Sequence, residues 1–260
     1  MSNPRLPAEI LDHVVDHLYD AKHTLRNCCL VSKSWIPRTR QHLFADINLK
    51  TTKNLESWKG MFPDPSTSPG YHTKTLSIGL FHRFTAADAD GWIRGFSRVV
   101  HLVVGGPRFC SGLSKVSLTP FHGFSPIKSL DISVTPSSQI FDFILSFRHL
   151  EDLTVRPCGI AILNIHDIFY GPPTAAQSSS LPVFSGTLNL PMARGTRHIA
   201  RGLLSLPDGI RFRELGFKWA EEGDALLTAA LVKRCSHTLK SLEVTCTPRC
   251  AHIRYLSPHR

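Results

Sequence analysis

The chain has 260 residues, of which 42% are hydrophobic and 19% are charged. This composition allows a sizeable buried core and excludes disorder throughout the chain. Lysine and arginine number 30 against 20 acidic residues, giving a net charge of +10. The excess is spread along the chain, without the Lys/Arg block of a nucleic-acid-binding arm. By length, we expect one large domain or two small ones.

The cysteines and the first residues indicate a reducing compartment. The seven cysteines are odd in number and irregularly spaced, which argues against a disulfide framework. The opening MSNPRLPAEILDH lacks the basic segment and apolar segment of a secretory signal. No stretch approaches the ~20 apolar residues of a membrane span. We therefore expect a cytoplasmic or nuclear protein with no membrane partner.

The first 48 residues predict three short helices. The first helix has Pro7 in its first turn and apolar residues at helical spacing, at Ile10, Leu11, Val14, Val15 and Leu18. The second is predicted over residues 24–31. The third begins at Ser32 or Ser34, is interrupted near Pro37 and runs toward Leu43. Three helices of this size make a poor core alone, so we expect them to have a partner.

A loop and then a recurring pattern follow the helices. Residues 60–72 hold three prolines and two glycines and predict a loop at a domain boundary. Beyond it, apolar residues recur at the first, fourth and sixth positions of short segments, clearly at 113–118, 127–132, 150–155, 212–217 and 239–244, and more weakly at 73–78, 99–104 and 185–190. The fourth positions are Leu76, Leu102, Val116, Leu130, Leu153, Leu188, Leu215 and Leu242.

With Val116 left aside, the fourth positions are 23 to 35 residues apart. This period and pattern are typical of leucine-rich repeats, in which each unit is one strand and a return helix. Residues 137–150, 196–206 and 224–239 have helical apolar spacing, and residues 170–182 form an insertion in the longest step. Val116 marks either an extra strand or a unit without its helix. The alternative is an ordinary α/β domain whose strands look alike.

The N-terminal block resembles the F-box, the adaptor module of cullin-RING ubiquitin ligases. The matching residues are Leu6-Pro7-x-Glu9-Ile10-Leu11, Val14, Leu18, Leu25, Cys29 and Leu30-Val31-Ser32-Lys33-Ser34-Trp35. Leu43-Phe44-x-x-Ile47 continues a pattern seen after the F-boxes of fungal proteins, whereas residues 19–24 lack the proline often found there. Many F-box proteins also carry leucine-rich repeats after the motif.

The resemblance implies an α/β protein with a small N-terminal helical F-box (1–48), a linker (49–72) and a degenerate leucine-rich-repeat solenoid of parallel strands and return helices (73–260). It also implies docking on a Skp-family linker protein through Leu6, Pro7, Ile10, Leu11, Val14, Leu25, Val31 and Trp35. The alternative for these residues is that they pack against the repeats.

The implied function is that of a substrate-recognition adaptor of a Skp/cullin/F-box ubiquitin ligase, in which the repeats bind a target protein. The alternative is a non-catalytic leucine-rich-repeat scaffold without a ligase role. The residues at the fifth strand position are expected on the concave side, and they name no target class: Ser77, Val103, Ser117, Asp131, Thr154, Asn189, Gly216 and Glu243.

We expect no metal, cofactor or catalytic residue. His13 and His17 have zinc-binding spacing, but Asp16 stands where an inverted zincin requires glutamate, and both fall on the polar side of their helix. A second candidate cluster lies near the C-terminus, at Cys235, His237, Cys246, Cys250 and His252, without the well-spaced knuckles of a structural site. Neither a nucleophile elbow nor a phosphate loop is present in the sequence.

A basic run covers residues 194–218. It holds Arg194, Arg197, Arg201, Arg211, Arg213 and Lys218 against Asp208 and Glu214, a net charge of +4. Such a run can face an acidic partner or nucleic acid. Because no aromatic residues interleave with it to stack on bases, we expect a solvated outer face of a repeat helix and no nucleic-acid partner.

Overall fold

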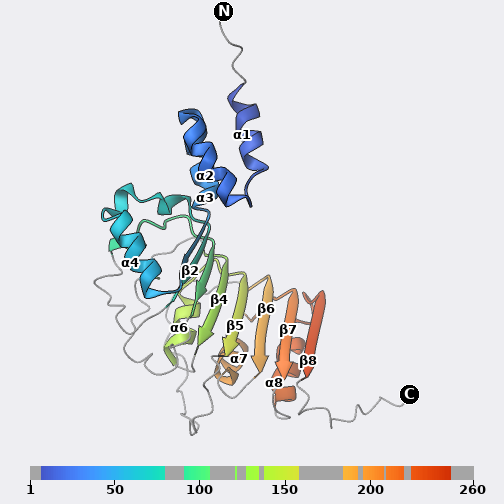
Figure 1. The fold of residues 1–260 in the computed structure, drawn as a ribbon. Coiled ribbons are helices and arrows are strands. Elements are labelled where there is room, and N and C mark those ends of the chain that lie inside the picture. Colours follow the sequence, from blue (N-terminus) through green and yellow to red (C-terminus); the bar gives the residue numbers. More distant parts are fainter. Residues whose placement is uncertain are drawn as a thin grey trace, which may run out of the picture.

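The computed structural model describes residues 7–79, 91–105, 121, 127–134, 138–157, 184–192, 196–207, 209–219 and 224–246. It is an α/β fold, with helices at the N-terminus and an eight-stranded, all-parallel sheet whose strands alternate with helices (Figure 1). This confirms the predicted class and the parallel strands.

The N-terminal helices form where the apolar spacing predicts them. They are α1 (Ala8–Asp16), α2 (Lys22–Val31), the short 3-10 helix η1 (Lys33–Trp35) and α3 (Ile36–Leu43). The Ser32 hydroxyl caps η1 by accepting a hydrogen bond from the Ser34 N–H at 3.3 Å. Pro37 lies in the first turn of α3, where its missing N–H has no helical partner to lose. The proline therefore begins the third helix instead of interrupting it.

The eight strands lie in the order of the sequence. They are β1 (Asp46–Leu49), β2 (Thr75–Ile78), β3 (His101–Val104), β4 (Ser129–Val134), β5 (Asp152–Pro157), β6 (Thr187–Met192), β7 (Glu214–Trp219) and β8 (Ser241–Cys246). The predicted fourth positions face one another in register across β2 to β8, as Leu76, Leu102, Leu130, Leu153, Leu188, Leu215 and Leu242. In β1, Ile47 occupies the same row.

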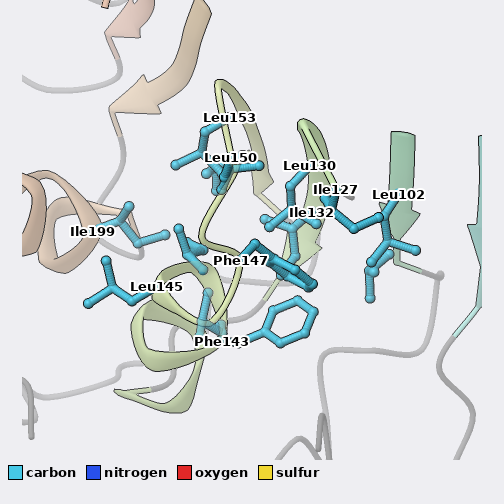
Figure 2. Close-up of a cluster of buried hydrophobic side chains, with 14 of the residues drawn as sticks. Leu102, Ile127, Leu130, Ile132, Phe143, Leu145, Phe147, Leu150, Leu153 and Ile199 are labelled. Carbon is cyan, nitrogen blue, oxygen red and sulfur yellow. The ribbon is translucent and has the colours of Figure 1, made fainter. Parts of the chain in front are cut away.

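Three of the intervening helices cover one face of the sheet (Figure 1). They are α6 (Ser138–Leu145), α7 (Arg197–Leu204) and α8 (Asp224–Cys235), and each lies inside a segment that the sequence predicts to be helical. The fourth-position leucines of β2 to β7 are at most 2% exposed. Figure 2 shows Leu130 and Leu153 in one apolar cluster with Phe143 and Phe147. These two phenylalanines meet edge to face with ring centroids 4.9 Å apart.

The helix layer is held by close contacts between successive helices. A Cβ built on Gly202 of α7 would stand 2.6 Å from the ring of Phe141 in α6, so only glycine lets the two helices approach this closely. Farther along, Arg197 of α7 donates to the fully buried Asp224 of α8 at 2.9 Å. The ion pair satisfies a carboxylate that would be costly to bury alone.

The sheet begins earlier than the sequence predicts. Strand β1 starts at Asp46, inside the segment assigned to the F-box, and pairs with β2. The predicted linker 49–72 contains the helix α4 (Thr52–Met61) and the 3-10 helices η2 (Pro65–Thr67) and η3 (Pro69–His72). The Thr51 hydroxyl caps α4, and Leu55 and Trp58 are buried one helical turn apart. The prolines and glycines of residues 60–72 therefore mark the end of a packed helix.

Two predicted features lie outside the described residues, namely the strand around Val116 and the insertion 170–182. Strand β3 pairs directly with β4.

The burial of the leucine row yields a matched stability prediction. Leu153→Ala should destabilise the fold by roughly 2–5 kcal/mol, because it leaves a cavity in a packed core. Leu242→Ala, at the same register position in β8, should cost less, because Leu242 is already 47% exposed. Chemical denaturation of both variants measures the difference in the free energy of unfolding. Equal losses of stability would contradict the difference in burial between Leu153 and Leu242.

Candidate docking surface of the N-terminal helices

The N-terminal helices share a small core. Val15 of α1, Leu25 and Cys28 of α2 and Thr39 of α3 are at most 6% exposed. Both α1 and α2 pack on α3 and η1 more than on each other. Figure 1 shows α1 and α2 as two separate helices beyond the end of the sheet. The arrangement leaves the outer sides of both helices uncovered.

A charged bridge fixes α1 on α3. Arg38 donates from Nε and Nη2 to the two carboxylate oxygens of Asp16, at 2.5 and 2.6 Å, and His42 Nε2 lies 2.7 Å from Asp16 Oδ1. The hydrogen bonds from Arg38, followed by the contact with His42, hold the pKa of Asp16 well below its usual range. Two parallel bonds to a planar guanidinium give the pair a defined geometry. The bridge therefore fixes the C-terminal end of α1 on α3.

The outer sides of α1 and α2 carry large apolar side chains. Ile10 and Val14 of α1 are 50% and 45% exposed, and Leu30 and Val31 of α2 are 86% and 68% exposed. We call these four residues the N-terminal apolar surface. Apolar residues grouped on two elements of one small unit mark an interaction site more often than isolated exposed ones do.

The predicted docking residues are placed unequally. Ile10, Val14 and Val31 belong to the N-terminal apolar surface, and Pro7 is also exposed. Leu11 and Trp35 are half-buried. The remaining two cannot be counted in the exposed surface, since Leu25 is fully buried in the helical core and Leu6 lies outside the described residues. The exposure of Ile10, Val14 and Val31 also shows that these three do not pack against the strands and helices that follow.

Leu30 belongs to the exposed surface but not to the docking set that the sequence predicts. The positions of the apolar residues around the helix could have predicted its exposure. Leu25 and Cys28, three residues apart, point into the core. Leu30 lies about 140° and 160° around the helix from these two residues, which turns it away from that side of α2. The spacing within α2 thus predicts the exposure of Leu30, but not that of Val31, which follows Cys28 by three residues.

An aromatic cluster joins the N-terminal helices to the sheet. Phe44, directly after α3, meets Trp58 and Phe62 with ring centroids 6.2 and 6.3 Å away, and Trp58 lies 5.4 Å from Phe96. The Ala45 carbonyl accepts hydrogen bonds from the N–H groups of Lys74 and Thr75. The connection is therefore a packed joint, which holds the helices at one end of the sheet.

The candidate metal ligands do not converge within the described residues. No group of three or more His, Cys, Asp or Glu side chains in this part of the chain is arranged to hold a metal ion. His13 and His17 are exposed, with ring centroids 4.7 Å apart. Burial raises the pKa of the Cys235 thiol, which disfavours the thiolate form that binds metal. Cys250 and His252 lie outside the described residues.

The basic run does not form one helix face. Arg197 and Arg201 lie on α7, Arg211 and Arg213 precede β7, and Lys218 lies within β7. Arg197 pairs with Asp224, whereas the other four are exposed. Arg194 and Asp208 lie outside the described residues.

Comparisons with protein-family models, with curated proteins and with solved structures give no match to this chain. None of the helices among the described residues is long and apolar enough to span a membrane.

The Asp16 bridge predicts a pH-dependent stability. A carboxyl group whose folded pKa is depressed stabilises the fold above its ordinary pKa, and this contribution is lost as the pH falls through the folded value. Asp16 is 34% exposed, so Asp16→Asn should destabilise the helices by about 1 kcal/mol near neutral pH, and by less in acid.

Amide hydrogen exchange in α1 and α3 measures this effect at each pH. Asp20→Asn, an exposed carboxylate beyond the end of α1, is the matched control and should change little. An Asp16→Asn effect that stays constant into acid would show that the charge of Asp16 does not stabilise the unit.

Proposed function

We propose that the chain is the substrate-recognition adaptor of a Skp/cullin/F-box type ubiquitin ligase. In this proposal the N-terminal helices are an F-box that docks on a Skp-family linker protein, and through it on a cullin-RING ligase. The strands and helices that follow form a degenerate leucine-rich-repeat solenoid that binds the target protein. The observation that carries the proposal is the N-terminal apolar surface, which lies on the two helices that contain the F-box-like residues.

The energetics favour a partner over solvent for this surface. Covering a fully exposed Val, Leu or Ile side chain stabilises a complex by roughly 1.5–3 kcal/mol. Ile10, Val14, Leu30 and Val31 are only partly exposed, so each offers about 1 kcal/mol or somewhat more. Together they contribute a few kcal/mol toward docking, against the free-energy cost of bringing two proteins together. Trp35, which is half-buried and follows these residues in the sequence, adds an aromatic contact.

The solenoid reading is supported by the register of the sheet. Parallel strands from units 23 to 35 residues apart place their fourth-position leucines in one row, as a stack of similar units requires. The role assigned to the chain is binding without chemistry or cofactor, so that ubiquitin transfer belongs to the partner enzymes. The target-binding part is the sheet with its helices.

Docking is tested by charging the apolar surface. The pair Ile10→Lys and Val31→Lys should abolish binding to a Skp-family protein, because two desolvated ammonium groups would replace apolar contacts. Leu226→Lys, on the exposed side of α8 and 81% exposed, is the control and should bind as the wild type does. Isothermal titration with purified proteins measures both, and circular dichroism checks that the variants fold. If the double variant bound the Skp-family protein with wild-type affinity, the F-box assignment would be wrong.

The ligase role is tested separately from docking. Target proteins that bind residues 73–260 should co-purify with the full-length chain. A reconstituted Skp/cullin/F-box assembly that contains this chain should ubiquitinate them. The Ile10→Lys, Val31→Lys variant should lose this activity. Docking on the Skp-family protein without ubiquitination of any bound protein would favour the alternative, a scaffold without a ligase role.

A further inference from the structure

The last strand and helix leave their apolar side uncovered. Leu242 and Val244 of β8 are 47% and 38% exposed, whereas Leu215 and Phe217, their register partners in β7, are 2% exposed. Within the described residues, β8 is hydrogen-bonded to β7 on one side only. The other edge of β8 thus presents backbone N–H and C=O groups together with two apolar side chains.

Helix α8 extends this apolar side. Arg234 reaches back toward the segment after α7, where its Nη2 donates to the Leu206 carbonyl at 3.3 Å. Ala229 and Val232 lie on the opposite flank of α8, because each residue turns a helix by about 100°. Ala229 is exposed and Val232 half-buried. We call Leu242, Val244, Ala229 and Val232 the terminal surface.

Two cations stand where β7 and β8 begin, namely Arg213 and Lys240, and both are exposed. Hydrogen bonds between the two segments that lead into these strands bring them together. The Lys240 N–H donates to the Arg213 carbonyl at 2.7 Å, and the Thr238 hydroxyl donates to the Phe212 carbonyl at 3.0 Å.

The nearest carboxylates on the strands face away from the exposed apolar side chains. Residues alternate between the two faces of a strand, so Glu243 of β8 lies on the face opposite Leu242 and Val244, and Glu214 of β7 lies on the face opposite Leu215. Glu214 is also engaged there by the Thr187 hydroxyl, which donates to it at 3.2 Å. The cations and the terminal surface therefore form one basic and apolar end of the sheet.

We propose that this end of the sheet binds an acidic, partly apolar segment of a target protein, which adds a strand beside β8. The unpaired edge supplies main-chain hydrogen bonds, as in other cases of strand addition. Leu242 and Val244 receive the apolar side chains of the segment, and Lys240 and Arg213 receive its carboxylates. The inference goes beyond the proposed function, because this binding does not require the N-terminal helices or a Skp-family protein.

Charge complementarity decides between the candidate occupants. Residues 247–260 contain three arginines, two histidines and no aspartate or glutamate, so the cations would repel this segment. A second copy of the chain would bring the same cations to the interface. Among the side chains that the structure describes, the exposed tyrosines Tyr19 and Tyr71 belong to other elements, so they offer no stacking platform for nucleic acid beside β8.

The test uses the full-length protein and a short fluorescent peptide that alternates glutamate with valine. Its matched control replaces each glutamate by lysine. We expect the acidic peptide to bind roughly tenfold more tightly or better than the control, with an affinity that falls as salt is added. The Ser241 N–H already donates to the Arg213 carbonyl, and the N–H groups of alternate residues point to opposite edges of a strand. On binding, hydrogen exchange should therefore slow in the amides of Leu242, Val244 and Cys246, which point to the free edge. Binding of both peptides alike, or binding without this protection, would overturn the proposal.

Matched substitutions locate the site. Arg213→Glu with Lys240→Glu should weaken peptide binding roughly tenfold or more. Lys74→Glu, at the equivalent position before β2, should not. Leu242→Lys should weaken binding, whereas Leu226→Lys, on the outward side of α8, should not. If each control variant weakened peptide binding as much as the site variant with which it is paired, the binding would be unspecific attraction and the proposed site would be wrong.

Two further outcomes would identify another occupant. In the free protein, slow exchange of the outward-pointing amides of Leu242, Val244 and Cys246 would show that the edge is already covered. If light scattering finds monomers, the chain covers its own edge; if it finds dimers, a second copy covers it. Displacement of the peptide by a single-stranded oligonucleotide that binds more tightly would identify a nucleic-acid surface. Each of these results would overturn the proposal without touching the F-box assignment, which rests on Ile10 and Val31.

Discussion

The rest of the structure depends on the register of one apolar row across the parallel sheet. Side chains alternate between the faces of each strand, so a slip of one residue would bring Asp131, Asn189 or Glu243 to the helix-covered side. The leucines of β2 to β7 are almost completely buried on that side. Since parallel strands cannot be joined by tight turns, the chain must cross back after each strand. The helices α6, α7 and α8 lie on these crossovers and cover the row.

The same constraint makes the two ends of the sheet differ. At the β1 end, α4 packs beside the first strand, and its Trp58 joins Phe44 and Phe96 in one aromatic cluster. That cluster also fixes the N-terminal helices. At the β8 end, the leucine row and the sixth-position row continue into Leu242 and Val244 without a described element to cover them. One end is therefore suited to hold a domain and the other to receive a segment.

The sequence predicts the parts of this fold that have periodic apolar spacing and misses several that lack it. The leucine row and the helices between the strands follow from periodicity, because every unit solves the same burial problem. Strand β1 has only four residues, and α4 precedes a segment rich in proline and glycine, so neither stands out. The Asp16 bridge joins residues 22 and 26 positions apart in the sequence. No periodic pattern can reveal such a contact. The F-box resemblance likewise names Leu25 and Val31 together, although one is buried and the other exposed.

Net charge alone would mislead about the partners of this chain, because strand alternation sorts the charges by face. Cations stand just before several strands, at Lys74, Lys128, Arg213 and Lys240, and all four are exposed. The open face of the sheet instead carries carboxylates on several strands, and the one arginine in the described strands, Arg156, is held there by Asp131 at 2.6 Å. A positive total of +10 thus coexists with a sheet face on which carboxylates are common. The attraction for acidic segments is confined to the strand starts. It becomes selective only beside β8, where exposed apolar side chains lie next to the cations.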